Sequence, residues 1–251
     1  MQFDIVTIFP RMVEAALADG VVARALQRGL LQVKVTDLRD FTDDRHRTVD
    51  DVPYGGGPGM VMKAEPIFRA VEAIATNGGA PQAIVLVSPH GRPFNQAEAV
   101  RLAGLERITI LCGRYEGIDD RVREGLATEE LSIGDYVLSG GELPALVIVD
   151  AVARLIPGVV GDEDSVAGDS FSRGLLDFPH FTRPAEFRDL RVPDVLVSGH
   201  HGEIRRWRKR RALELTLDRR PDLLAGAELD VEEQEILREL MDKKGAAHGR
   251  D

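Results

Sequence analysis

The sequence has few of the residues on which several classes of protein depend. Its 251 residues include one cysteine, Cys112, so a disulfide framework and a multi-cysteine zinc site are both excluded. No apolar run approaches the roughly 20 residues that a membrane-spanning helix needs. The N-terminal MQFDIVTIFPRM has neither the basic nor the apolar region of a signal peptide, so we expect a cytoplasmic protein with no membrane partner. The six histidines show no metal-ligand spacing such as HExxH, and we assign no metal ligands.

Charge and apolar content indicate a folded chain with an acidic surface. Hydrophobic residues make up 43% of the chain and charged residues 29%, as in a globular protein rather than a disordered one. The formal net charge of −10 argues against a protein covered by nucleic acid. One local exception is the basic segment 205–211, where six cationic residues surround Trp207. It is either a solvated helix face or a surface for single-stranded RNA, and the second is favoured because so many charges cannot all pair locally.

The hydrophobic pattern predicts two domains. Strand-like and helix-like segments alternate over the first two-thirds of the chain, as in an α/β domain. The apolar runs 83–87 and 108–111 predict buried parallel strands, with helices after the N-cap Asn95 and over 143–155. The small, polar and acidic segment 161–174 predicts a flexible linker between domains 1–160 and 175–246.

The second domain is expected to contain two helices. A basic helix is predicted around 202–216, and an amphipathic one opens near Asp230. Residues 247–251 are predicted to form a disordered tail. The last helix should present one apolar face, formed by Ile236, Leu237, Leu240 and Met241.

Three glycine-rich segments are candidates for ligand binding. Segment 53–60 (PYGGGPGM) lacks the spacing of GxGxxG and of a P-loop, so it is either a tight turn or a backbone that approaches a ligand closely. Segments 113–121 and 132–144 follow or contain strands, and open α/β sheets bind ligands at the carboxyl ends of their strands. Each segment alone is ordinary turn chemistry. Together they are equally consistent with ordinary turns and with a site that holds an adenine edge or a polar cofactor with main-chain hydrogen bonds.

The remaining candidates are ordinary when taken one at a time. Nucleophilic catalysis has no support, because no GxSxG elbow exists and Cys112 follows the apolar Ile110 and Leu111 as a buried residue would. Asp169 is predicted to be a solvated loop residue. Arg154 is predicted to be a charge at a helix C-terminus, where the helix dipole favours it.

With these segments assembled, the sequence resembles the bacterial tRNA (guanine(37)-N(1))-methyltransferase family of the SPOUT class. The resemblance covers essentially the whole chain. It implies an α/β domain with a parallel sheet and a deep C-terminal trefoil knot at about 85–140, followed by a small, mainly α-helical C-terminal domain. Topology alone would predict an ordinary Rossmann-like sheet. The motifs in order are DDVPYGGGPGMVM (50–62), LCGRYEGIDDRV (111–122), SIGDYVLSGGELPALVIVDAVARLIPGVVG (132–161), GLLDFPHFTRP (174–184) and EIRRWR (203–208).

The resemblance also implies a methyl donor and an assembly. The family binds S-adenosylmethionine within the knot and acts as a homodimer, with the active site shared between subunits. It needs magnesium, for which this sequence offers no dedicated ligands. The cofactor-binding residues carried over from it are Leu86, Ser88, Pro89, Gly113, Tyr115, Glu116, Ser132, Ile133, Gly134, Asp135, Tyr136, Val137, Leu138, Gly140, Gly141 and Pro144.

For catalysis the resemblance implies Asp169 as the general base at guanine N1 and Arg154 as the cation that stabilises charge on O6. The chain departs from the family pattern at Ser172-Arg173 and at His200. The alternatives are a non-catalytic RNA-binding protein and a knotted methyltransferase of ribose 2′-hydroxyls; the presence of both catalytic candidates opposes the first, and the segment 174–184 opposes the second. The residues implied to bind the tRNA anticodon stem-loop are Gly59, Ser170, Asp177, His180, Arg183, Arg205, Trp207 and Arg208.

Overall fold

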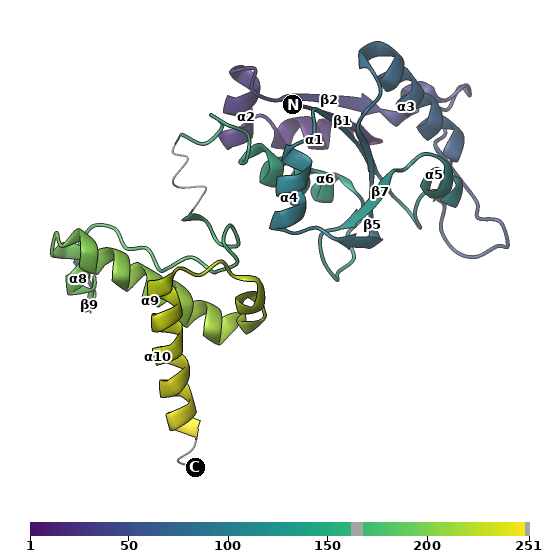
Figure 1. The fold of residues 1–251 in the computed structure, drawn as a ribbon. Coiled ribbons are helices and arrows are strands. Elements are labelled where there is room, and N and C mark those ends of the chain that lie inside the picture. Colours follow the sequence, from purple (N-terminus) through teal and green to yellow (C-terminus); the bar gives the residue numbers. More distant parts are fainter. Residues whose placement is uncertain (162–167, 249–251) are drawn as a thin grey trace. The chain divides into compact units, whose positions relative to one another are not determined.

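The computed structural model describes residues 1–161 and 168–248 (Figure 1). The chain divides into two compact units, Met1–Gly161 and Asp162–Asp251. Residues 162–167 of the predicted linker and 249–251 of the predicted tail lie outside the described residues. No helix in the described ranges is both long and apolar enough to cross a membrane.

The first unit is built on five parallel strands in the order β2-β1-β6-β5-β7. The central strand β6 is buried along its whole length, as its continuous apolar run predicted. The predicted α/β class with a parallel sheet is therefore confirmed. The strands are β1 (Gln2–Thr7), β2 (Gln32–Asp37), β5 (Ala83–Pro93), β6 (Arg107–Cys112) and β7 (Glu129–Ser132).

Helices cover both faces of this sheet (Figure 1). Successive side chains of a strand point to opposite faces, so Phe3 and Ile5 enter one core and Val6 the other. One core is covered by α1 (Pro10–Ala16), α2 (Gly20–Gln27), α4 (Gln96–Ala103) and α6 (Glu142–Ala153). The other is covered by α3 (Ala64–Gly78) and α5 (Asp120–Gly125). The predicted N-cap of α4 is confirmed, because Asn95 Oδ1 accepts a hydrogen bond from the Glu98 N–H at 3.1 Å.

Shorter elements complete the unit. The 3-10 turn η1 (Leu38–Phe41) follows β2, and the short strands β3 (Asp50–Asp51) and β4 (Val61–Met62) pair antiparallel. These two strands enclose the glycine-rich segment 53–60. The hairpin thus projects that segment as a loop of its own.

Strand β5 continues beyond its apolar run. Its pairing with β7 shifts register between Val87 and Arg92, so residues 88–91 bulge out before the strand pairs again with Leu131 and Ser132. At Gly91 an added Cβ would lie 2.4 Å from the Leu131 backbone nitrogen, so the two backbones lie in direct contact. The bulge places residues 88–91 at the carboxyl end of the sheet.

The second unit is mainly helical. It contains β8 (Glu186–Phe187), β9 (Leu190–Arg191), α8 (Asp194–Val197), α9 (His201–Arg219), η2 (Pro221–Gly226) and α10 (Val231–His248). Helix α9 confirms the predicted basic helix, and a small core forms around Leu175, Leu213 and Ile236.

Two expectations for the C-terminal part differ from the structure. Met241 is 55% exposed, so the predicted apolar face holds for Ile236, Leu237 and Leu240 but not for Met241, which lies beyond the small core. Helix α10 also continues to His248, two residues into the predicted tail. Alanine is the best helix former, which accounts for this extension through 246–247.

Candidate functional site

A cavity of about 500 Å³ opens at the carboxyl ends of β5, β6 and β7. Three loops surround it: the β5 bulge, the loop after β6 and the loop between β7 and α6. Open parallel sheets bind ligands at this edge, and the volume is that of a small-molecule site. Of the predicted cofactor residues, Asp135 does not line the cavity. Those that do are Leu86, Ser88, Pro89, Gly113, Tyr115, Glu116, Ser132, Ile133, Gly134, Tyr136, Val137, Leu138, Gly140, Gly141 and Pro144.

The loops are fixed by short hydrogen bonds. Ser88 Oγ accepts from the His90 N–H at 3.0 Å, and the Gly141 N–H donates to the Gly113 carbonyl at 2.8 Å. The wall therefore combines main-chain polar groups with apolar side chains such as Leu138 and Pro144. This mixture suits a ligand with one flat apolar part and one polar part.

A buried ion pair joins two of these loops, and sequence reasoning missed it. Glu142 is completely buried; its Oε1 accepts from Thr7 Oγ1 at 2.7 Å and its Oε2 from Arg114 Nε at 2.9 Å. Arg114 also donates to the Ser139 carbonyl at 3.0 Å and lies 4.5 Å above the Phe9 ring. One guanidinium thereby ties the loop after β6 to the loop before α6. An acidic residue opening a helix is expected for the dipole alone, so the sequence holds no signal of this burial.

The glycine-rich segment 53–60 meets the cavity wall at its end, through Gly59 and Met60. A Cβ on Gly59 would lie 2.3 Å from Glu116 Oε1, and Gly59 adopts φ +82°. Glu116 in turn donates its N–H to the Met60 carbonyl at 3.0 Å. Residues 55–57 instead have open space around them. The tight-turn interpretation is confirmed, because the Gly56 N–H donates to the Pro53 carbonyl at 3.2 Å, whereas the close approach to a ligand stays a prediction.

The structure confirms that Cys112 is buried. Burial raises the pKa of its thiol well above the ordinary value, so the thiolate needed for nucleophilic attack is disfavoured. Among residues 1–161 and 168–248, no group of three or more His, Cys, Asp or Glu side chains could hold a metal ion.

The two predicted catalytic residues lie in different units. Arg154 is the C-cap of α6 in the first unit, where its N–H donates to the Asp150 carbonyl at 3.2 Å. Asp169 is half-buried in the second unit, and its carbonyl accepts from the Ser172 N–H at 3.2 Å. Residues 169–174 form hydrogen-bonded turns, where the sequence predicted a flexible linker.

Several predicted RNA contacts lie together in the second unit. Within it, a cavity of about 420 Å³ is lined by His180, Arg183, Trp207 and Arg208. Aromatic rings form part of its wall: Phe181 stands 6.3 Å from Trp207, and the Arg208 guanidinium lies 4.9 Å above Phe178. Ser170 and Asp177 lie beside it, because Ser170 Oγ accepts from the Asp177 N–H at 2.9 Å and Asp177 binds His180 at 2.7 Å. Gly59 belongs to the first unit.

The basic segment 205–211 divides into two sets of charges. Lys209 binds Asp230 and Glu232 at 2.7 Å, Arg210 pairs with Glu239, and Arg211 pairs with Glu214. Within the part of the chain that the structure describes, no ion pair involves Arg205, Arg206 or Arg208, and all three are exposed. The expectation that these charges cannot all pair locally is confirmed, and the unpaired set is defined.

The fold and the cavity define an open α/β protein with a cavity of small-molecule size at the carboxyl ends of its parallel strands. The family model of the tRNA (Guanine-1)-methyltransferase TrmD family matches residues 1–226. The chain belongs to this family.

Curated relatives support this membership over nearly the full length. The protein named tRNA (guanine-N(1)-)-methyltransferase of Pelotomaculum thermopropionicum is 56% identical over 242 residues, which cover 96% of each chain. Its namesake from Geobacter metallireducens is 53% identical over 241 residues, covering 96% of this chain and 98% of the relative. That of Moorella thermoacetica is 51% identical over 246 residues, covering 98% of each chain.

Proposed function

We propose that the protein transfers a methyl group from S-adenosylmethionine to N1 of guanine 37 in tRNA, in the cytoplasm. The observation that carries this proposal is the cavity at the ends of β5, β6 and β7, which gathers all the predicted cofactor residues except Asp135. Family membership over residues 1–226 supplies the reaction class. When bound, the donor supplies a sulfonium methyl group that is open to attack by a nucleophile.

The chain's own groups fit such a donor. The apolar side chains of Leu86, Leu138 and Pro144 offer a surface for an adenine ring, and the glycine-rich loops bring main-chain groups to the same space. A volume of about 500 Å³ admits a nucleoside with a short polar tail. These residues would bind and orient the donor.

Asp169 and Arg154 are proposed to act on the guanine. N1 carries a proton and is a poor nucleophile until that proton leaves. Asp169 would accept it while Arg154 stabilises the charge that develops on O6. A carboxylate is a weak base for this proton, so positioning must supply much of the effect. Guanine N1 lies on the Watson–Crick edge of the base, so the guanine must be unpaired, as it is in an anticodon loop.

A homodimer is proposed to complete the site, with the cavity of one subunit and Asp169 of the other. The first unit exposes apolar side chains along two helices that pack together: Phe9 and Met12 at the start of α1, and Leu143 and Val147 on α6. Exposed apolar patches of this kind mark interaction surfaces. Contact of this face with a second copy would cover it.

A trefoil knot over about 85–140 is proposed for the same unit. Its support is the close contact at Gly91, where the continuation of β5 approaches the Leu131 backbone too closely for any side chain. The helical domain 175–246 is proposed to bind the anticodon stem-loop through the unpaired charges of α9 and the aromatic cavity beside them. A magnesium requirement has no assigned ligands and enters no proposed step.

Methyl transfer to defined RNAs tests the proposal. Purified protein would be given methyl-labelled S-adenosylmethionine and tRNA transcripts that differ only at position 37, and the product nucleoside would be identified by mass spectrometry. We expect 1-methylguanosine with guanine 37 and no product with adenine 37. A 2′-O-methylated product would indicate the ribose methyltransferase, and RNA binding without any transfer would indicate the non-catalytic alternative.

Subunit complementation tests the shared site. An Asp169→Asn subunit and a Gly141→Trp subunit should each be inactive alone, and their mixed dimer should recover activity. If mixed dimers form, as shown by light scattering, and remain inactive, the site is not shared in the proposed way.

A further inference from the structure

The side chain of Arg173 links the turn that carries Asp169 to the start of α10. We propose that Arg173 is a positioning residue, which clamps this turn to the N-terminus of α10 and so fixes the base for methyl transfer. This inference rests on the proposed function of Asp169. Both residues belong to the same unit, so the geometry lies within one folded body.

Residues 169–177 form a compact turn. The Ser172 N–H donates to the Asp169 carbonyl at 3.2 Å, and the Phe171 N–H donates to the Leu175 carbonyl at 2.7 Å. Phe171 adopts φ +75°, a conformation that a non-glycine residue keeps only where its surroundings enforce it. The turn therefore needs external contacts to hold its shape.

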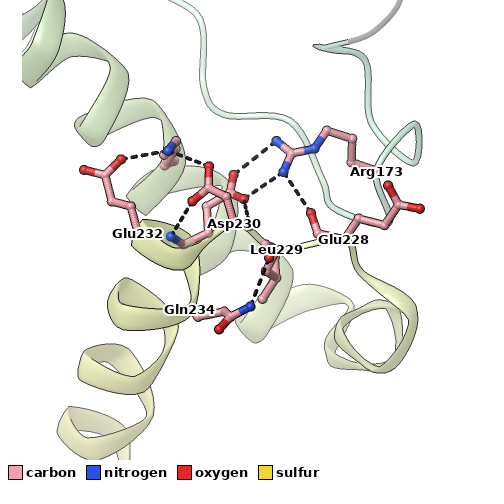
Figure 2. A network of polar contacts seen from close by, with 8 residues as sticks. Arg173, Glu228, Leu229, Asp230, Glu232 and Gln234 are labelled. Atoms are coloured by element: carbon pink, nitrogen blue, oxygen red, sulfur yellow. Dashed lines mark hydrogen bonds and ion pairs between the residues drawn. The ribbon is translucent and has the colours of Figure 1, made fainter.

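Arg173 supplies several of these contacts (Figure 2), beside the hydrogen bond that the Leu176 N–H donates to Thr216 Oγ1 at 2.9 Å. Its two terminal nitrogens reach the two carboxylate oxygens of Glu233 at 3.2 and 2.7 Å. The same side chain donates to the Glu228 carbonyl at 2.8 Å, and the Glu228 N–H donates back to the Arg173 carbonyl at 3.2 Å. A two-point guanidinium–carboxylate pair fixes direction as well as distance.

Glu233 is itself immobilised, so the clamp has a rigid base. It is 2% exposed and forms a reciprocal capping box with Asp230: the Asp230 N–H donates to Glu233 Oε2, and the Glu233 N–H donates to Asp230 Oδ1, both at 2.9 Å. Asp230 also binds Lys209 of α9 at 2.7 Å. Figure 2 shows this network running from the turn through the start of α10 to α9.

Losing the clamp should loosen the turn without unfolding the unit. Leu175 is buried in the small core independently of the Arg173 side chain, and we expect it to keep the chain beyond the turn attached. Asp169 would then spend less time in the orientation that accepts the guanine proton. A misplacement of about 1 Å can lower a rate by about 100-fold. The rate of methyl transfer should therefore fall more than the affinities for tRNA and S-adenosylmethionine.

Single-turnover kinetics test the clamp. Arg173→Met should lower the rate at saturating tRNA and S-adenosylmethionine by roughly 10- to 100-fold, with little change in the dissociation constants of either. Arg173→Lys, which keeps the charge, should recover part of the rate. Arg238→Met, which removes an exposed charge from α10, is the matched control and should behave like the parent.

Hydrogen exchange gives a readout independent of the chemistry. Amides of residues 171–177 should exchange faster in Arg173→Met than in the parent or in Arg238→Met. An active parent with an unchanged Arg173→Met rate, or unchanged exchange in the turn, would overturn the proposal. An inactive parent would instead refute the proposed function, and exchange would still decide the clamp. If Arg173→Met does not fold, the single-turnover rate and the hydrogen exchange of Arg173→Lys are compared with those of the parent. If both equal the parent's values, the clamp is refuted.

Discussion

Replacing Arg114 by methionine is expected to destabilise the first unit severely, because it leaves the Glu142 carboxylate buried with only the Thr7 hydroxyl as partner. At 2.8 Å and an effective dielectric constant of 20, the gross attraction of the Arg114–Glu142 pair is about 6 kcal/mol. Desolvation cancels much of this, and removing one partner of a buried pair costs about 3–5 kcal/mol. We expect a loss of that size, with weakened S-adenosylmethionine binding because two cavity loops are no longer tied.

The assay is urea unfolding followed by circular dichroism, with Trp207 fluorescence as a separate signal from the second unit. Arg121→Met is the matched control, because Arg121 pairs with Asp119 on the same loop but its side chain is 72% exposed. Such exposed pairs are worth about 0–1 kcal/mol. The Trp207 transition should be unchanged in both variants. Equal losses for the two variants would refute the idea that burial of Glu142 makes this pair important.

Three further predictions concern other elements. Gly141→Ala should lower stability and abolish cofactor binding measured by calorimetry, because its Cβ would lie 2.7 Å from the Cys112 Cα. Gly113→Ala, with nearest neighbours at 3.4 Å, should leave stability near that of the parent, and equal stability of the two variants would contradict this reasoning. Removing Arg205, Arg206 and Arg208 together should weaken tRNA binding and reduce the log–log salt slope by roughly 0.7–0.9 per lost phosphate contact, while a triple replacement of the paired Lys209, Arg210 and Arg211 should change the slope less. Lys209 and the Glu233 N–H hold the pKa of Asp230 below its ordinary value, so its stabilisation is full above the unfolded pKa of about 3.9 and is lost as pH falls through the lower folded value; Asp230→Asn should therefore be less stable than the parent at pH 7 and converge with it near pH 2, as measured by Trp207 fluorescence.

The parallel sheet and its helices could be predicted from residue patterns. Continuous apolar runs at 83–87 and 108–111 became buried strands, and Asn95 with Glu98 marked the start of α4. These signals are local, since they depend on periodicity and capping within a few residues. The location of the cavity followed from the rule that ligands bind at the carboxyl ends of parallel strands.

Features that depend on contacts distant in sequence could not be predicted. The partners Thr7, Arg114 and Glu142 are up to 135 residues apart, and nothing near Glu142 indicates that it is buried. The polar composition of 161–174 suggested a flexible linker, because the anchor that orders residues 169–174, Glu233, lies 60 residues beyond Arg173. The sequence showed that Ser172-Arg173 departs from the family pattern, but it did not show that Arg173 pairs with Glu233.

Because Cys112 is buried, the rate at which its thiol reacts with a reagent reports how often the core around it opens. Its thiol lies at the end of β6, between β1 and β5, and is 2% exposed. A thiol reagent can modify it only when the core around it opens, so the labelling rate reports the frequency of that opening. Because the chain has no other cysteine, the signal comes from one place. Ligands that occupy the adjoining cavity should slow the reaction, which would allow their affinities to be measured without labelling the protein elsewhere.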